Sequence, residues 1–355
     1  MFNSIVIKSK VNEKYKVHFI ENLQISLEKE IEKSSVIFVI DENVYKLFQS
    51  TFQTFVSKEK IILITSIEKN KTIDYAQFLI RELIANNIRK NDTIIAIGGG
   101  ITQDIVAFVS SILYRGVKWK FYPTTLLAQC DSCIGSKSSI NFDKYKNLLG
   151  TFIPPNEIFI FPNFLYTLED SEIKSGIGEM LHYFFTDGID QALSISKNYQ
   201  NLFLDRSSLL PYIYQSLLIK KNTIELDEFD LNIRHKFNYG HTFGHAIEAI
   251  CDYTIPHGQA VTIGMDIANY ISLKLNLLSI VDFDIMHNIL LKNKPTFSIN
   301  IDNIDNFLFA LSRDKKNIEN KLGCILTKGP GKVEKYFLDM DLNFKKIILE
   351  YFQLY

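Results

Sequence analysis

The stretch "DTIIAIGGGITQDIVAF", residues 92–108, decides the fold class. It joins a short β-rich apolar run to a helical pattern through three consecutive glycines, Gly98, Gly99 and Gly100. A helix that begins directly after a glycine turn presents free backbone N–H groups and a partial positive charge, which suit a pyrophosphate. The spacing is not G-x-G-x-x-G, so the usual dinucleotide fingerprint is not met and a plain tight turn stays the alternative.

Similar apolar runs alternate with helical patterns through residues 1–160. Strand, helix, strand repeated in this way predicts a parallel α/β sheet, which binds ligands beyond the carboxyl ends of its strands. The predicted strands are 35–40, 60–65, 92–97, 117–122 and 157–161, and the helices between them include 72–88 and 102–113.

Beyond residue 161 the pattern becomes mainly helical, with one late apolar pair that predicts a short hairpin, "LGCILTKGPGKVEKYFL". We therefore divide the chain into an α/β domain, 1–162, and a helical domain, 163–355. The helices expected in the second domain are 172–185, 207–226, 241–251, 257–276 and 302–313.

Composition excludes several classes of protein. The chain is 46% hydrophobic and 22% charged with a net charge of −1, so we expect neither a nucleic-acid-binding surface nor a membrane-binding one. No apolar run approaches a membrane span and no signal peptide is recognisable, which makes the cytoplasm the expected compartment. The pair Cys130 and Cys133 could be a redox pair or half a zinc site, but two small buried residues are the preferred interpretation.

A segment rich in cations and small residues, 114–155, is the first candidate site. Three cations and an amide among glycines and hydroxyl residues indicate an anionic substrate, although a solvated loop would look similar. The residues concerned are Arg115, Asp131, Lys137, Lys146 and Asn147. Two further loops, with Asp41 to Asn43 and with Glu68 and Lys71, could hold an adenosine ribose.

A second candidate site combines histidines with a glutamate. "FNYGHTFGHAIEA", residues 237–249, places His241 and His245 on one helix face, and His257 opens another helix. Glu179 and His182 share a face of an earlier helix. One carboxylate and two histidines would make a three-ligand zinc set with a position open for substrate. The H-x-x-x-H lacks the glutamate of H-E-x-x-H, so a zinc peptidase has no general base here.

The ordered motifs resemble those of the 3-dehydroquinate synthases, which are sugar phosphate cyclases. The resemblance covers about residues 35–330 and rests on "GGGITQD", "YRGV", "PTTLLAQCDSCIGSK", "KNLLGTF", "SGIGEMLHY", "NYGHTFGHAIE" and "HGQAVTIGM". It implies an N-terminal Rossmann-like NAD-binding α/β domain, a mainly α-helical C-terminal metal- and substrate-binding domain, a metal in the cleft, and a homodimer. The implied activity is the NAD- and zinc-dependent (or cobalt-dependent) cyclisation of 3-deoxy-arabino-heptulosonate 7-phosphate to 3-dehydroquinate with loss of phosphate.

The resemblance also assigns residues. The implied metal ligands are Glu179, His241 and His257. The implied phosphate-side residues are Lys137, Asn147, His245, Lys316 and, from the partner subunit, Arg115. The implied hydroxyl and carboxylate end of the substrate site comprises Asp131, Lys146, Lys220, Arg234 and Asn238, with His182 beside it. The implied NAD site comprises Asp41, Glu68, Lys71, Gly98, Gly99, Gly100, Asp104, Thr124 and Thr125, and Asp131, Lys137 and Lys146 border it.

Four positions depart from the family pattern. His182 stands where lysine is usual, Ser136 and Gln103 where glycine is usual, and Gln259 where glutamate is usual. His182 matters most, because lysine is a fixed cation whereas histidine can be neutral at pH 7. Two alternatives therefore stay open: a cyclase acting on a different heptulose phosphate, such as an aminodehydroquinate-type or secondary-pathway paralogue, and a non-catalytic paralogue.

Overall fold

The computed structural model describes residues 4–53, 60–143, 145–252, 254–295, 304–313, 317–318 and 321–354. The chain forms two compact units, one of Met1–Leu168 with Lys220–Phe229 and one of Glu169–Ile219 with Asp230–Tyr355. The first unit therefore extends past the expected boundary at residue 162 and also takes in residues 220–229. This return segment is tied to the N-terminus, because Ser9 Oγ and the Lys10 N–H donate to Glu228 over 2.8 and 2.6 Å.

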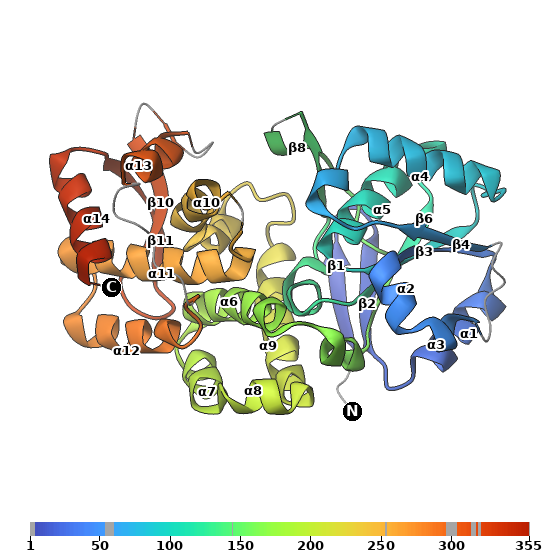
Figure 1. Cartoon of the computed structure of the whole chain (residues 1–355), viewed down its shortest axis with the longest axis horizontal. Coiled ribbons are helices and arrows are strands. Elements are labelled where there is room, and N and C mark those ends of the chain that lie inside the picture. The colour runs from blue at the N-terminus through green and yellow to red at the C-terminus, as the bar shows by residue number, and fades with distance from the viewer. Residues whose placement is uncertain are drawn as a thin grey trace. The chain divides into compact units, whose positions relative to one another are not determined.

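The first unit is built on a seven-stranded sheet in the order β1-β2-β9-β6-β5-β3-β4 (Figure 1). Strands β1 and β2 pair antiparallel, and the remaining neighbours pair parallel. Every residue of β3 and β5 is buried, as in parallel strands covered on both faces. The strands are β1 Ile5–Ser9, β2 Glu13–Phe19, β3 Val36–Asp41, β4 Ile61–Ile64, β5 Thr93–Gly98, β6 Lys118–Pro123 and β9 Glu157–Ile160.

Helices cover both faces of this sheet. Figure 1 shows α4 and α5 on one face and α1, α2 and α3 on the other. On the latter face Leu27 and Phe52 pack with Phe38 and Ile97 in a buried apolar cluster. Their bounds are α1 Leu23–Lys33, α2 Glu42–Leu47, α3 Gln49–Gln53, α4 Ile73–Ala85 and α5 Gly100–Ile112.

A second, smaller sheet in this unit is the hairpin of β7, Lys137–Phe142, and β8, Tyr145–Phe152. Its register shifts between Ile140 and Phe142, which marks a β-bulge. Bulges re-aim side chains and often lie beside functional sites. The apolar pattern did not predict this hairpin, because polar residues occupy much of both strands.

The second unit is organised around α11, His257–Lys274, which is buried continuously from Gly258 to Ser272. Most of its buried residues are apolar or small, and the buried carboxylate of Asp266 is bonded by His287 and Tyr351. The surrounding elements are α6 Asp170–Asp187, α7 Asp190–Asn198, α8 Asn201–Leu204, α9 Leu210–Ile224, α10 His241–Ile250, α12 Ile280–Leu291, α13 Ile304–Ser312, α14 Leu342–Leu354, and the hairpin β10 Lys321–Thr327 with β11 Val333–Asp339. The last turn of α9 belongs to the first unit.

These elements confirm the predicted order of strands and helices. The predicted strands correspond to β3, β4, β5, β6 and β9, and the predicted late hairpin to β10 and β11. The sequence reading missed the β1–β2 hairpin and helices α1, α2, α3, α7, α8, α12 and α14. None of the described helices combines the length and the apolar character that a bilayer span requires.

A partly buried group of charges joins α1 to the sheet. Lys120 of β6 pairs with Glu30 of α1 and, at 2.6 Å, with Glu157 of β9. His18 of β2 lies 3.2 Å from the same glutamate. Hydrogen bonding with His18, aided by Lys120, lowers the pKa of Glu157 from 4.5 to about 2 against the opposing effect of burial.

This arrangement predicts an acid-sensitive contribution to stability. Because the folded pKa of Glu157 lies below the unfolded one, its contribution is complete above about pH 4.5 and is lost as the pH falls toward 2. Glu157→Gln should therefore lower the free energy of unfolding by about 1–3 kcal/mol at pH 7 and by progressively less below pH 4.5. Trp119, the only tryptophan, is buried beside Lys120, so its fluorescence during urea unfolding reports on this sheet.

Glu21→Gln, at an exposed position, is the matched control and should leave stability unchanged. A loss in Glu157→Gln that is equally large at pH 7 and at pH 2 would contradict the ionic origin of this contribution.

Candidate functional site

Three predicted residues lie at the carboxyl ends of neighbouring parallel strands. Asp41 ends β3, Gly98 ends β5, and Thr124 directly follows β6. The Thr124 N–H donates to the Gly98 carbonyl over 2.9 Å, which fixes the two strand ends together. In open α/β sheets this edge is where ligands bind, so the topology brings the predicted dinucleotide residues to the expected place.

The glycine turn opens directly into α5. Gly99 is the N-cap and supplies no side-chain cap, so the first turn of α5 is open to an anion. A Cβ on Gly99 would lie 2.9 Å from the Thr125 methyl carbon, and one on Gly98 would lie 2.1 Å from Thr102 Oγ1. The turn is therefore a tightly packed cradle that accepts only glycine at these two positions, and its shape and polarity fit a pyrophosphate.

Two loops beside this edge carry further predicted residues. Asp41 accepts hydrogen bonds from the N–H groups of Asn43 and Val44, so it also caps α2. Lys71 donates to Asp104 of α5 over 2.9 Å. Burial raises the pKa of Asp104, and the ion pair with Lys71 opposes that increase.

Lys220 and Asp131, far apart in sequence, form a buried pair. Lys220 Nζ donates to the Asp131 carbonyl over 2.8 Å and to its carboxylate over 2.7 Å. Asp131 lies in a π-helical turn, Ala128–Ser132, a geometry often found at functional sites. In the same turn region both Cys130 and Cys133 are buried, and burial raises the pKa of Cys133 to about 12, which confirms their reading as small core residues.

Two loops carry three of the phosphate-side residues. Lys137 and Asn147 lie on the β7–β8 hairpin, together with Lys146 of the predicted hydroxyl and carboxylate end. Arg115 is exposed on a turn where Tyr114 and Arg115 both have positive φ, 50° and 59°. Lys90 Nζ holds this strained turn by donating to the carbonyl of Tyr114 over 2.7 Å. Lys316 lies outside the described residues.

The predicted metal ligands come together in the second unit. Glu179 of α6, His241 of α10 and His257 of α11 offer donor atoms that all lie within 4.8 Å of one another. Glu179 Oε1 lies 3.2 Å from His257 Nε2 and 3.6 Å from His241 Nε2, yet has no hydrogen-bond partner among the described residues. A buried carboxylate oxygen in that position is costly unless a cation meets it, so this donor set fits Zn²⁺ or Co²⁺.

Glycines set the spacing of these ligands. A Cβ on Gly178 would lie 1.9 Å from the Gly258 carbonyl oxygen, and one on Gly258 would lie 1.8 Å from that of Ser175. Helices α6 and α11 therefore touch backbone to backbone, with Glu179 and His257 each adjacent to one of these glycines. The φ of +79° at Gly240, the N-cap of α10, then turns the chain into the helix that begins with His241.

Glu248 is a residue of this site that the sequence reading missed. Its Oε2 lies 3.2 Å from His257 Nδ1, the nitrogen opposite the proposed metal-binding one. Burial lowers the pKa of His257, but Glu179 and Glu248 outweigh it and raise the pKa to about 10. A carboxylate in this position fixes the tautomer of a metal-binding histidine. The available signal was its helical spacing, three residues after His245 and seven after His241.

His245 and His182 flank the metal ligands. The His245 ring centroid lies 5.5 Å from that of His241 and 5.6 Å from that of His257, and the residue is exposed. His182, only 1% exposed, has its Nδ1 3.7 Å from Glu179 Oε2 and its ring 5.0 Å from His241. The expectation that His182 shares the face of Glu179 is thus met in the structure.

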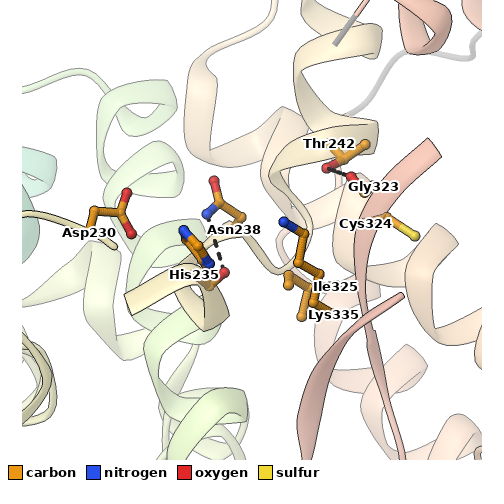
Figure 2. A pocket seen from close by; sticks show the side chains of 8 residues that line it. All are labelled: Asp230, His235, Asn238, Thr242, Gly323, Cys324, Ile325 and Lys335. Carbon is orange, nitrogen blue, oxygen red and sulfur yellow. Dashed lines mark hydrogen bonds between the residues drawn. The ribbon is translucent and has the colours of Figure 1, made fainter. Parts of the chain in front are cut away.

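Asn238 lines a separate pocket of about 220 Å³ in the second unit (Figure 2). Its amide nitrogen donates to the carbonyl of His235 over 3.2 Å, and Lys335 of β11 supplies a cation to the wall. Arg234 is buried on the same short helix as Asn238, Ile233–Asn238. The pocket is smaller than a usual ligand site.

The departure at Gln103 has a structural account. Its amide nitrogen donates to the Ser132 carbonyl over 2.6 Å, and its amide oxygen accepts from Ser132 Oγ over 2.7 Å. This pair of bonds ties α5 to the turn that carries Asp131. Ser136 and Gln259 are both buried, and nothing in the structure explains why they replace the usual residues.

Comparison with known proteins agrees with this arrangement. The family model described as 3-dehydroquinate synthase N-terminal matches residues 61–175, and the corresponding C-terminal model matches 176–317. A 3-dehydroquinate synthase of Clostridium tetani is 34% identical over 344 residues, which is 94% of this chain and 91% of the relative. One of Helicobacter pylori (strain P12) is 37% identical over 279 residues, 78% of this chain and 79% of the relative.

Two solved structures share the fold. A 2-deoxy-scyllo-inosose synthase complexed with carbaglucose-6-phosphate, NAD⁺ and Co²⁺ superposes with a TM-score of 0.86 at 24% identity, covering 99% of this chain and 100% of its own. A 2-epi-5-epi-valiolone synthase of Streptomyces hygroscopicus with NAD⁺ and Zn²⁺ gives 0.83 at 21% identity, with 96% of each chain covered. They confirm the predicted fold class, an α/β N-terminal part followed by a helical C-terminal part.

The geometry of the metal cluster predicts how the affinity for the metal depends on a ligand, His241, and on a residue that orients a ligand, Glu248. His241→Ala should lose the metal, because it removes one of three ligands. Glu248→Gln should weaken metal binding by about tenfold or more, because His257 loses the carboxylate that fixes its tautomer. Competition with a chromophoric chelator measures both. Glu172→Gln, exposed on α6, is the control. Unchanged affinity in Glu248→Gln would remove that residue from the site, and unchanged affinity in His241→Ala would remove the cluster.

Proposed function

Because this chain belongs to the 3-dehydroquinate synthase family, we propose that it converts 3-deoxy-arabino-heptulosonate 7-phosphate to 3-dehydroquinate and phosphate. The family models together match most of the chain. The observation that carries the proposal is the Glu179–His241–His257 cluster, whose donor types and spacing suit a catalytic metal with an open position. The bond broken joins carbon to the phosphate oxygen, so the enzyme is a carbon–oxygen lyase.

Two bound groups complete this chemistry: NAD supplies a temporary hydride acceptor, and the divalent metal supplies a Lewis acid for the hydroxyl being oxidised. The cradle at Gly98 to Gly100 would hold the pyrophosphate, and Glu68 and Lys71 the adenosine ribose. Glu179, His241 and His257 would hold the metal, with Glu248 orienting His257. The likeness to synthases solved with NAD⁺ and Co²⁺ or Zn²⁺ supports these assignments.

Cations and amides would bind the phosphate group. Lys137 and Asn147 supply a positive charge and an amide from one hairpin, and His245 supplies a ring nitrogen beside the metal ligands. Arg115 would act on the partner subunit of a homodimer. Its exposed, strained turn supports that role, because strain is retained where a side chain must be presented in a fixed direction. Lys316 would also contribute at this end.

The other end of the substrate would meet Lys146, Arg234, Asn238 and the Asp131–Lys220 pair. A buried guanidinium forms two parallel hydrogen bonds with a carboxylate, which selects for the acid over a neutral sugar. Lys220 is held by Asp131 and can hold or pass a proton at a substrate hydroxyl. The presence of both Arg234 and Asn238 supports the carboxylate-bearing substrate.

The overall reaction predicts a simple redox signature. Product and phosphate together contain the atoms of the substrate at the same oxidation level, so no net reduction of NAD can occur. Phosphate release should require NAD and the metal, yet absorbance at 340 nm should not rise as phosphate accumulates. Stoichiometric NADH would instead indicate a simple dehydrogenase. A panel of heptulose phosphates should show the heptulosonate as the preferred substrate.

Removing the guanidinium should cost catalysis in a substrate-dependent way. Arg234→Ala should lower kcat/KM for the heptulosonate by about tenfold or more, since charged hydrogen bonds are each worth about 1.5–3 kcal/mol. It should change kcat/KM for a heptulose phosphate lacking the carboxylate far less. Arg313→Ala, an exposed arginine of the same unit, is the control. Preference of the parent enzyme for the carboxylate-free sugar would contradict the proposed substrate.

A further inference from the structure

Asn141 occupies the bulge of the β7–β8 hairpin. Ile140 pairs with Leu149, but the next paired residues are Phe142 and Tyr145, so β8 loops out through Lys146 to Leu148 opposite Asn141. The bulge leaves Asn141 buried and pairs it with Thr72, outside the hairpin. Because a buried amide is out of reach of water, its donor and acceptor groups must bond to specific partners in the protein.

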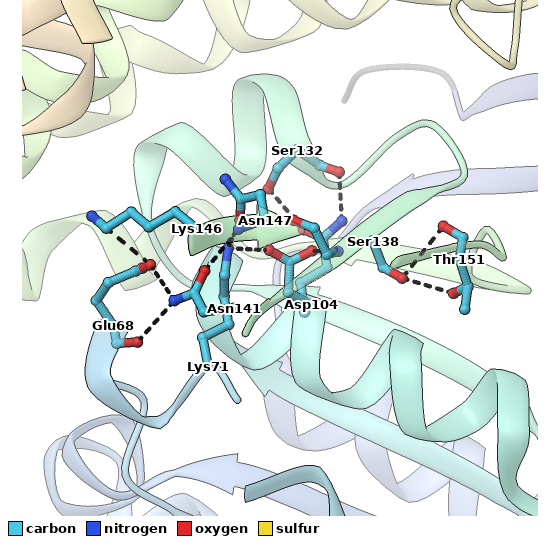
Figure 3. Close-up of polar contacts among 11 residues, drawn as sticks. Glu68, Lys71, Asp104, Ser132, Ser138, Asn141, Lys146, Asn147 and Thr151 are labelled. Carbon is cyan, nitrogen blue, oxygen red and sulfur yellow. Dashed lines mark hydrogen bonds and ion pairs between the residues drawn. The ribbon is translucent and has the colours of Figure 1, made fainter. Parts of the chain in front are cut away.

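The hydrogen bonds of Asn141 join two separate loops (Figure 3). Its backbone N–H donates to the Lys71 carbonyl over 2.7 Å, and its amide nitrogen donates to Glu68 Oε1 over 2.8 Å. Its amide oxygen accepts from the backbone N–H of Asn147 over 2.9 Å. One side chain thus connects the proposed ribose-binding loop to the proposed phosphate-binding loop.

A second connection runs parallel to the first. Lys71 Nζ donates to Asn147 Oδ1 over 2.6 Å while also donating to Asp104 over 2.9 Å. Ser139 Oγ donates to the same Asn147 oxygen over 2.9 Å. Because that oxygen accepts both bonds, the amide NH₂ group of Asn147, a donor suited to phosphate, is directed away from Lys71 and Ser139.

The backbone of Asn147 makes this support necessary. Its φ is +53°, a left-handed conformation that asparagine tolerates better than most residues but that still costs more than the ordinary regions. The bond from its N–H to Asn141 holds that conformation, and Asn141 in turn is oriented by Glu68. Whatever fixes Glu68 therefore fixes the backbone that presents the phosphate-binding amide.

We propose that Asn141 is a positioning residue that couples dinucleotide binding at Glu68 and Lys71 to phosphate binding at Asn147. This inference rests on the proposed function, since it takes NAD and a phosphate ester as the two ligands. Ribose hydroxyls that bind Glu68 hold its carboxylate still, the carboxylate holds the Asn141 amide, and the amide holds Asn147 in its strained conformation. NAD thereby lowers the ordering cost of phosphate binding, and by linkage phosphate strengthens NAD binding by the same factor.

The test measures this factor directly. Calorimetric titration of the metal-loaded protein with inorganic phosphate, with and without saturating NAD⁺, should show phosphate binding tightened at least about fivefold by NAD⁺. In Asn141→Ala the factor should fall to within about twofold of one, although each ligand still binds. If Asn141 were merely structural, its replacement would weaken phosphate binding equally with and without NAD⁺, and the coupling factor would not change.

The same hairpin offers a matched control. Ser138 lies three residues before Asn141, and its hydroxyl lies 2.8 Å from Thr151 Oγ1 across the strand pair (Figure 3). Ser138→Ala removes a buried polar contact from the hairpin without touching either loop. It should keep the wild-type coupling factor, so a loss of coupling in this variant would overturn the specific role of Asn141.

A second variant tests the amide donor of Asn141 separately from its amide acceptor. Asn141→Asp keeps an oxygen for the Asn147 N–H but replaces the donor to Glu68 with a repelling carboxylate. It should fold, as a thermal melt would show, and should also lose the coupling, so it decides the question if Asn141→Ala does not fold. Wild-type coupling in either variant, or a wild-type factor of one, overturns the proposal. Absence of NAD⁺ binding by the wild type overturns the proposed function with it.

Discussion

The close approach of helices α6 and α11 is the constraint on which the metal cluster depends. Gly178 and Gly258 leave no room for a side chain between the two backbones, and the Gly258 N–H donates to Ser175 Oγ over 3.0 Å across the contact. The distance between the two backbones therefore sets the distance between Glu179 and His257, which are adjacent to these glycines. Helix α10 is set in the same way, because a Cβ on Gly264 of α11 would lie 2.0 Å from the Gly240 carbonyl. The positions of the three metal ligands are therefore set by the packing of the helix backbones.

In the first unit, the predicted dinucleotide-binding residues are brought together by the sheet and not by helix packing. Parallel strands bring Asp41, Gly98 and Thr124 to one edge through topology alone. The residues proposed for phosphate binding lie on a hairpin outside that sheet, so they need a separate attachment. Hydrogen bonds through Asn141 and Lys71 provide it, and the extra residues of β8 opposite Asn141 bring Asn147 within reach of the Asn141 amide.

The sequence predicted the parallel strands and long helices well because each carries a continuous apolar signal. β5 and α5 were evident from "DTIIAIGGGITQDIVAF", and the late hairpin from its pair of apolar runs. The β1–β2 and β7–β8 hairpins were missed because polar residues interrupt their strands. Glu248 and Asn141 were missed because their roles depend on contacts with other segments of the chain. A glutamate on a helix or an asparagine on a strand does not by itself indicate which residue it will contact. Lys220 was placed through resemblance, and its pairing with Asp131 appears only in three dimensions.

The most direct test of this account is a crystal structure of the metal-loaded protein with anomalous diffraction data collected at the metal absorption edge. The account predicts one strong peak at about 2.0–2.2 Å from Glu179 Oε1, His241 Nε2 and His257 Nε2. The neighbouring donors His245, Glu248 and His257 also lie within 4.8 Å of one another, so the chain offers its own competing position. A peak on that side of His257, or none at either position, would contradict the assignment of the catalytic metal.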